Sequence, residues 1–196
     1  MSVMIKCPSG LLSGEIRGLQ GKNLSLLDDR QAQQSGKFID KMLKHCWVRT
    51  ENAGTYPLDK DGMPDWSQVL TGDRFYAMLR VRALMRGEDF AFPADCNRTR
   101  DCKPFDVHVN LLQDLDVRNL AEADREAFQA GNRLEAHLPD GRKFWFKLPT
   151  GELEARIASF GKQARNLIPA LCTRILEIEG VEDGGIRGYF EEGDMN

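Results

Sequence analysis

The chain has 196 residues, of which 41% are hydrophobic and 29% are charged, and its formal net charge is −3. This length fits one large domain or two small ones, and the composition is that of a globular protein rather than a disordered or fibrous one. The slight negative charge argues against a generally basic nucleic-acid-binding protein, although it leaves room for a local basic patch.

The sequence has no sign of a membrane anchor or a secretory leader. No apolar run approaches the roughly 18 residues that a membrane-spanning helix needs, and the N-terminal stretch lacks the apolar core and cleavage pattern of a signal peptide. Five cysteines, an odd number spread along the chain, are typical of reduced thiols. We therefore expect a soluble protein that remains in the cytoplasm where it is made, with no membrane contact.

The N-terminal quarter predicts strands, turns and one helix. Residues 1–27 suggest strand and turn, with Leu12 and Ile16 facing the core. Apolar residues recur at helical spacing over 37–48, which predicts a helix ending near Cys46. Residues 49–65 are rich in Asn, Gly, Pro and Asp, so we expect a long loop there, of the kind that often makes contacts.

The best-formed element of the chain is a helix over residues 70–87. Asp73 lies in its first turn, where the helix dipole favours a negative charge, and Gly87 is a typical stop signal. The residues that recur every three or four positions along it are Phe75, Met78, Leu79, Arg82 and Met85. A short strand from Phe90 to Pro93 follows, and its aromatic residues, together with Phe75 and Tyr76, are expected mostly in the core.

The second half of the chain predicts an antiparallel meander flanked by helices. Residues 104–111 alternate as a strand, 119–130 form a short helix, and Asp140-Gly141 is a strong hairpin signal between strands 133–138 and 143–148. Leu153, Ala155 and Ile157 alternate and predict a third strand. An apolar stripe over 160–179 indicates helix, with a break or kink near Asn166 and Pro169 in the first turn of a second helix.

These elements together predict the α+β class. We expect an antiparallel β meander packed with several helices in a single domain over residues 1–180, followed by a flexible acidic tail over 181–196.

Two stretches of the chain are alike. Pro8-Ser9-Gly10 and Pro149-Thr150-Gly151 are each followed by a strand-like segment, a Gly-Lys pair and an apolar pair. One interpretation is coincidence among common turn residues. The other is a duplicated turn–strand–helix unit whose two strands, near residues 12–18 and 152–158, pair in one sheet.

The cysteines do not form a recognisable metal motif. Cys96 and Cys102 are separated by five residues, whereas structural zinc sites use four ligands, commonly in closely spaced pairs. The pair is therefore either a remnant of a zinc knuckle or two free thiols on a loop, and we expect no bound cofactor. No catalytic motif is present, because the three histidines lack an obvious nucleophile or acid partner in sequence. We expect no enzymatic activity.

Arginines concentrate around the central helix and the segment after it. They suit a protein interface, where arginine is enriched, or a solvated helix face. A nucleic-acid site would also need accessible aromatic residues, so nucleic-acid binding is not expected. An alternative is a degenerate zinc-ribbon module that binds nucleic acid through the arginine-rich loop. The candidate interface residues are Arg74, Arg80, Arg82, Arg86, Arg98 and Arg100.

The order of these motifs resembles a known family. The block Leu70-Thr71-Gly72-Asp73-Arg74-Phe75-Tyr76, followed by an aromatic exit from Gly87 to Phe92, is its most specific part. Pro8-Ser9-Gly10 precedes this block, and the Leu148 to Gly151 turn follows it. The chain resembles the baseplate hub and tail assembly proteins of T-even-type contractile-tailed bacteriophages over most of residues 7–178. Where family members often carry a tight Cys-Pro-x-Cys knuckle, this chain has Cys96 and Cys102.

The resemblance implies a non-enzymatic bacteriophage tail protein. Its expected role is as a baseplate hub component or a chaperone-like assembly factor, with hub and tape-measure proteins as partners. Its expected location is the virion tail and baseplate, or the host cytoplasm during assembly.

Overall fold

The computed structural model describes residues 2–35, 37–94, 105–159, 172–182 and 185–186, and its mixture of helices and antiparallel sheets confirms the α+β class. In chain order its elements are β1 (Ser2–Lys6), β2 (Ser13–Arg17), the 3-10 helix η1 (Gly21–Asp28), α1 (Arg30–Gln34), α2 (Phe38–Cys46), β3 (Trp47–Asn52), α3 (Thr71–Arg86), β4 (Asp89–Ala94), β5 (Phe105–Asn110), α4 (Glu122–Gln129), β6 (Leu134–His137), β7 (Lys143–Phe146), α5 (Gly151–Ser159) and β8 (Ile175–Ile178).

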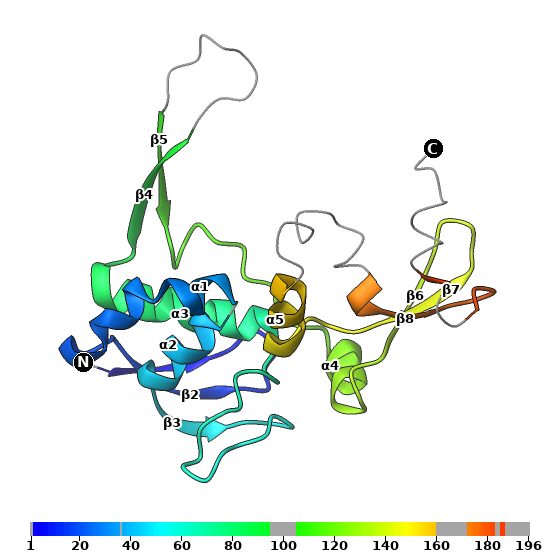
Figure 1. Cartoon of the computed structure of the whole chain (residues 1–196), viewed down its shortest axis with the longest axis horizontal. Coiled ribbons are helices and arrows are strands. Elements are labelled where there is room, and N and C mark those ends of the chain that lie inside the picture. The colour runs from blue at the N-terminus through cyan, green and yellow to red at the C-terminus, as the bar shows by residue number, and fades with distance from the viewer. Residues whose placement is uncertain (1, 36, 95–104, 160–171, 183–184, 187–196) are drawn as a thin grey trace.

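The N-terminal body consists of one sheet covered by two helices. Strands β1, β2 and β3 form an antiparallel sheet, and α3 and α2 pack beside it (Figure 1). Leu12 and Ile16 are fully buried, as the sequence predicts. At Gly14 a Cβ atom would stand 2.4 Å from the ring of Trp47, so β2 and β3 approach closely only because this residue has no side chain. The core of the protein lies between this sheet and α3.

The helix predicted over 37–48 is present as α2, but the loop predicted over 49–65 begins as a strand. The chain leaves α2 at Cys46 and enters β3 directly at Trp47, continuing to Asn52. Trp47, Val48 and Thr50 have high β propensity, and β3 pairs antiparallel with β2. That partner is more than 30 residues away in sequence, so local composition does not reveal it.

Helix α3 has the predicted bounds but a different buried face. It begins at Thr71, and Gly87 ends it with a φ of 84°. Asp73, Arg74, Ala77 and Val81 are its buried residues, whereas Phe75 is 51% exposed. The expectation that Phe75 belongs to the core is therefore wrong. The face toward the sheet follows positions 73, 77 and 81, which are spaced by four residues.

The predicted third strand of the meander is wrong. The Asp140-Gly141 hairpin joins β6 and β7 as expected, but residues 151–159 form helix α5, and the third strand is β8, which pairs with β7. Leu153 and Ile157 are four residues apart and fit a helix as well as a strand, and the intervening Glu, Ala and Arg residues favour helix. Part of the helix predicted over 160–179 is thus strand, and 160–171 lie outside the described residues.

The proposed duplication of a turn–strand–helix unit is wrong for the same reason, because its second strand is a helix. The two Pro-Ser/Thr-Gly turns nevertheless meet at the start of α3. Ser9 bonds to the Asp73 carboxylate, while the Thr71 amide donates to the Pro149 carbonyl at 2.9 Å and Leu70 bridges to Thr150. The two turns therefore lie at the same end of α3.

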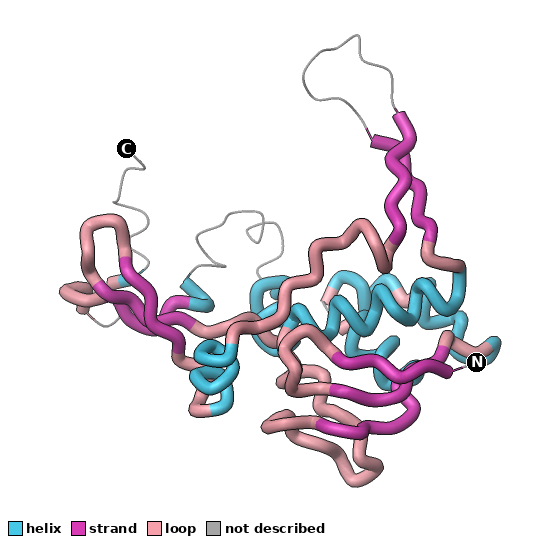
Figure 2. The backbone as a smooth tube through the Cα atoms, turned by 180° about the vertical axis from the view of Figure 1, so that it is seen from behind, coloured by secondary structure: helices cyan, strands magenta, loops and turns pink. Residues whose placement is uncertain are grey.

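Helix α4 and the C-terminal sheet lie to one side of this body (Figure 1 and Figure 2). Helix α4 is present as predicted, and the sheet β6–β7–β8 lies at the far end of the molecule from the N-terminal sheet (Figure 2). Most of the predicted acidic tail, including 187–196, falls outside the described residues. Within the described residues no helix is long and apolar enough to cross a membrane.

Candidate interaction surface

The hairpin formed by β4 and β5 projects from the body, away from the core (Figure 1). Its strands are paired antiparallel from Asp89↔Asn110 to Ala94↔Phe105. Because side chains alternate between the two faces of a strand, one face of this ribbon carries only apolar side chains. Those side chains are Phe90, Phe92, Ala94, Phe105, Val107 and Val109, which we call the hairpin face.

The hairpin face is open to solvent. Phe90 and Phe92 are each 39% exposed and Phe105 is 55% exposed, and the rings of Phe90 and Phe92 lie 5.6 Å apart. The opposite face carries Asp89, Asp106, His108 and Asn110, beside Ala91 and Pro93. The ribbon is therefore amphipathic, with its apolar side uncovered within the described part of the chain. The prediction that Phe90 and Phe92 belong to the core is wrong.

Arg82 fixes the base of the hairpin to α3. Its guanidinium donates to the Gly87 carbonyl at 2.7 Å and lies 5.3 Å from the centre of the Phe90 ring. Just after β5, the Leu111 amide donates to the Glu88 carbonyl at 2.9 Å, and Leu111 is buried. The hairpin face therefore points to the same side as Arg82, because Phe90 belongs to it.

An apolar groove of about 240 Å³ runs beside α3, and the same arginine is among its lining residues. Helix η1, α2 and α3 form its walls. Arg82 is shared by the groove and the hairpin face, since it lines the groove and its guanidinium lies over the Phe90 ring. The residues that line it are Leu27, Phe38, Met42, Met78, Leu79, Val81, Arg82, Met85 and Arg86.

The six predicted interface arginines differ in location and burial. Arg82 and Arg86 lie at the groove and the hairpin base, and Arg80 is partly exposed on the same helix. Arg74 is fully buried, so its assignment to an interface is wrong. Arg98 and Arg100, together with Cys96 and Cys102, lie outside the described residues, in the segment that connects β4 to β5.

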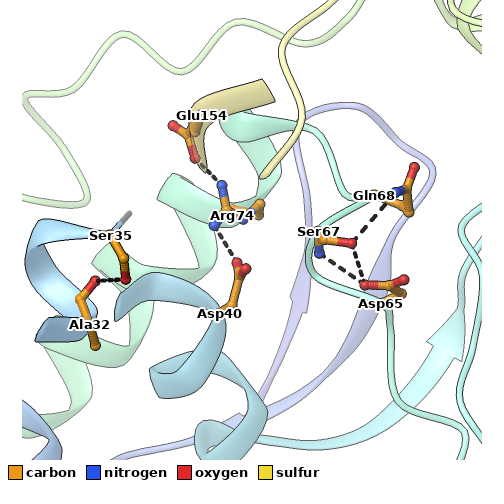
Figure 3. A network of polar contacts seen from close by, with 8 residues as sticks. All are labelled: Ala32, Ser35, Asp40, Asp65, Ser67, Gln68, Arg74 and Glu154. Atoms are coloured by element: carbon orange, nitrogen blue, oxygen red, sulfur yellow. Dashed lines mark hydrogen bonds and ion pairs between the residues drawn. The ribbon is translucent and has the colours of Figure 1, made fainter. Parts of the chain in front are cut away.

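The buried Arg74 side chain connects its own helix, α3, to α2 and α5. Its guanidinium donates to Asp40 of α2 and to Glu154 of α5 (Figure 3). A Cβ atom on Gly151, at the start of α5, would stand 2.8 Å from the Arg74 guanidinium carbon, so α5 packs directly on this side chain. A buried arginine with two carboxylate partners is typical of a structural tie.

Asp73 forms a second buried cluster in the same turn of α3. Its carboxylate accepts from the Ser9 amide at 2.9 Å, the Ser9 hydroxyl at 2.5 Å and the Tyr56 hydroxyl at 3.0 Å. Burial raises the pKa of Asp73 above its usual range, although these hydrogen bonds act in the opposite direction. Burial and the Asp73 charge also raise the pKa of the Tyr56 phenol. Three donors converge on one carboxylate, which anchors the N-terminal turn and the 53–70 loop to α3.

Neither buried cluster was assigned from the sequence as a structural site. The sequence predicts Asp73 only as a helix-start residue, because its three donors come from residues that are 64 and 17 positions away. Among the described residues no group of three or more His, Cys, Asp or Glu side chains is placed to hold a metal ion.

No family model matches the chain, and no curated protein or solved structure is significantly similar to it.

Proposed function

We propose that this protein acts through protein–protein contacts, using the β4–β5 hairpin as its docking arm. The observation that carries the proposal is the uncovered hairpin face, which presents three phenylalanines on one side of a two-stranded ribbon. A hairpin of two strands is marginally stable in water, and contiguous apolar patches on soluble proteins often mark binding sites. A partner that covers this face stabilises the ribbon and removes the phenylalanines from water.

We further propose that the setting of this contact is a contractile bacteriophage tail. The resemblance of the Leu70 to Phe92 block to baseplate hub and tail assembly proteins supports this, and the same block contains α3 and β4. The partners would be hub or tape-measure proteins, and the protein would serve as a hub component or an assembly factor. It would act in the virion or in the host cytoplasm during assembly.

A pair of matched variants tests the proposal. The chain is tagged and produced in infected cells, and the co-purifying hub and tape-measure proteins are quantified by mass spectrometry. Phe92→Ser combined with Phe105→Ser places hydroxyls on the hairpin face, and we expect it to abolish co-purification without lowering the melting temperature. Phe75→Ser is the control, because Phe75 is 51% exposed on α3 and does not line the groove.

Two outcomes would contradict the proposal. Retention of the tail proteins by the Phe92 and Phe105 variant would show that the hairpin face is not the contact. Recovery of no tail protein by the unaltered chain would remove the phage assignment.

A further inference from the structure

We propose that the groove beside α3 receives an amphipathic helix of the partner, with an acidic residue of that helix placed against Arg86. This inference rests on the proposed function, since it names the second contact of the same docking surface. The size of the hairpin face indicates that a second contact is needed.

The hairpin face alone is small for a specific interface. Six residues of strand extend about 20 Å, and two strands are about 10 Å wide, so the face projects roughly 200 Å². A stable interface covers about 800 Å² on each partner. A partner bound to the hairpin therefore has to reach the body, and the groove is an apolar surface that shares Arg82 with the hairpin face.

The walls of the groove favour a helix as the occupant. They are formed by η1, α2 and α3, whose backbone amides and carbonyls are largely occupied within the helices. An extended segment would find few backbone partners there and would leave its own polar groups unpaired. A helix satisfies its backbone internally and inserts only side chains.

The length and the lining of the groove fit such a helix. From Met78 to Arg86 the lining follows α3 for about 12 Å, at 1.5 Å per residue. Apolar anchors at i, i+3 or i+4, and i+7 of a bound helix cover nearly the same distance, about 10.5 Å. Met42, Met78 and Met85 line the groove, and methionine adapts its shape to inserted side chains.

The positive charge of the groove lining favours an acidic residue on the bound helix. Arg82 and Arg86 are the charged lining residues of the groove, and among the residues that the structure describes no carboxylate lines it. Arg82 is already bonded to the Gly87 carbonyl, whereas Arg86 is exposed and has no ion-pair partner within the described part of the chain. An acidic side chain in the first turn of the bound helix is favoured by its own dipole and would pair with Arg86.

The test uses two fluorescein-labelled 16-residue peptides. Both carry leucines at i, i+3, i+4 and i+7 on an alanine-rich helix, and they differ only in two glutamates or two lysines in the first turn. Binding to the full chain is measured by fluorescence anisotropy. We expect the glutamate peptide to bind about tenfold more tightly than the lysine peptide, and Arg86→Glu to reverse this preference.

Arg80→Glu is the matched control, because it makes the same charge change on the same helix outside the groove lining, and it should leave the preference in place. Equal binding of the two peptides, binding of neither, or an equal effect of Arg80→Glu and Arg86→Glu would overturn the inference. The hairpin variant Phe92→Ser with Phe105→Ser should bind the glutamate peptide normally. If the peptides fail while that variant still loses the tail proteins, the groove inference falls and the docking role of the hairpin stands.

Discussion

Replacement of Arg74 by alanine should strongly destabilise the fold. The Arg74 side chain is fully buried, and its two partners, Asp40 and Glu154, are 25% and 32% exposed. Removing one member of a buried ion pair costs about 3–5 kcal/mol, because the remaining charge is left without compensation. Asp40 and Glu154 retain part of their hydration, so we expect a loss of about 3 kcal/mol. A domain of typical stability has only about 5–15 kcal/mol to lose.

The free energy of unfolding is measured by urea titration with tryptophan fluorescence. Trp47 and Trp66 are suitable reporters, because both are buried and their ring centres lie 5.1 Å apart. Arg80→Ala is the control, since Arg80 is partly exposed on the same helix, and surface substitutions usually change stability by less than about 0.5 kcal/mol. If Arg74→Ala costs no more than Arg80→Ala, the three-helix tie is not a stabilising contact and the reasoning is refuted.

Three further predictions concern buried ionisable groups. Asp73→Ala should cost about 1–3 kcal/mol, because the donors of Ser9 and Tyr56 lose their acceptor, whereas Asp73→Asn should cost less. Burial raises the pKa of Asp73 in the folded protein, so the stability of the wild type relative to Asp73→Asn is greatest at low pH and falls as pH rises through the folded pKa. Urea titrations from pH 4 to 7 measure this difference. A difference that grows with pH would contradict the prediction. Burial raises the pKa of Cys46 to about 11 and also raises that of Cys7, so neither thiol should react with iodoacetamide at pH 8 until urea unfolds the chain. Alkylation of either thiol in the native protein, mapped by mass spectrometry, would show that the N-terminal body opens.

The elements with strong local signals could be predicted from the sequence. Gly87 ends α3 where a left-handed residue is required, and Asp140-Gly141 turns the chain between β6 and β7. Helix α2 follows from its apolar periodicity. In each of these cases residues close in sequence determine the conformation.

The elements that depend on distant partners could not be predicted. The sequence predicts a strand where α5 lies and a helix where β8 lies, because apolar residues four positions apart fit both periods. Packing of α5 against Arg74 and pairing of β8 with β7 determine the actual conformation. Arg74 was placed at the surface, since the carboxylates that allow its burial are 34 and 80 residues away.

The hairpin face was missed for a related reason. The sequence predicts both strands, but aromatic residues on a strand usually belong to a core. Their exposure follows from the lack of a covering layer within the described part of the chain, which local sequence does not reveal. The alternation of apolar residues on both strands was the available signal.

The central claim is that the hairpin face becomes covered when the protein binds its partner. The most direct measurement is 19F NMR of the chain labelled with 4-fluorophenylalanine, in which Phe90, Phe92, Phe105 and Phe75 are assigned by single Phe→Leu substitutions. On addition of purified tail hub, we expect the resonances of the three hairpin phenylalanines to shift and to lose their sensitivity to a soluble paramagnetic probe, while that of Phe75 stays unchanged. Hairpin resonances that remain unshifted and accessible in the bound complex would contradict the account.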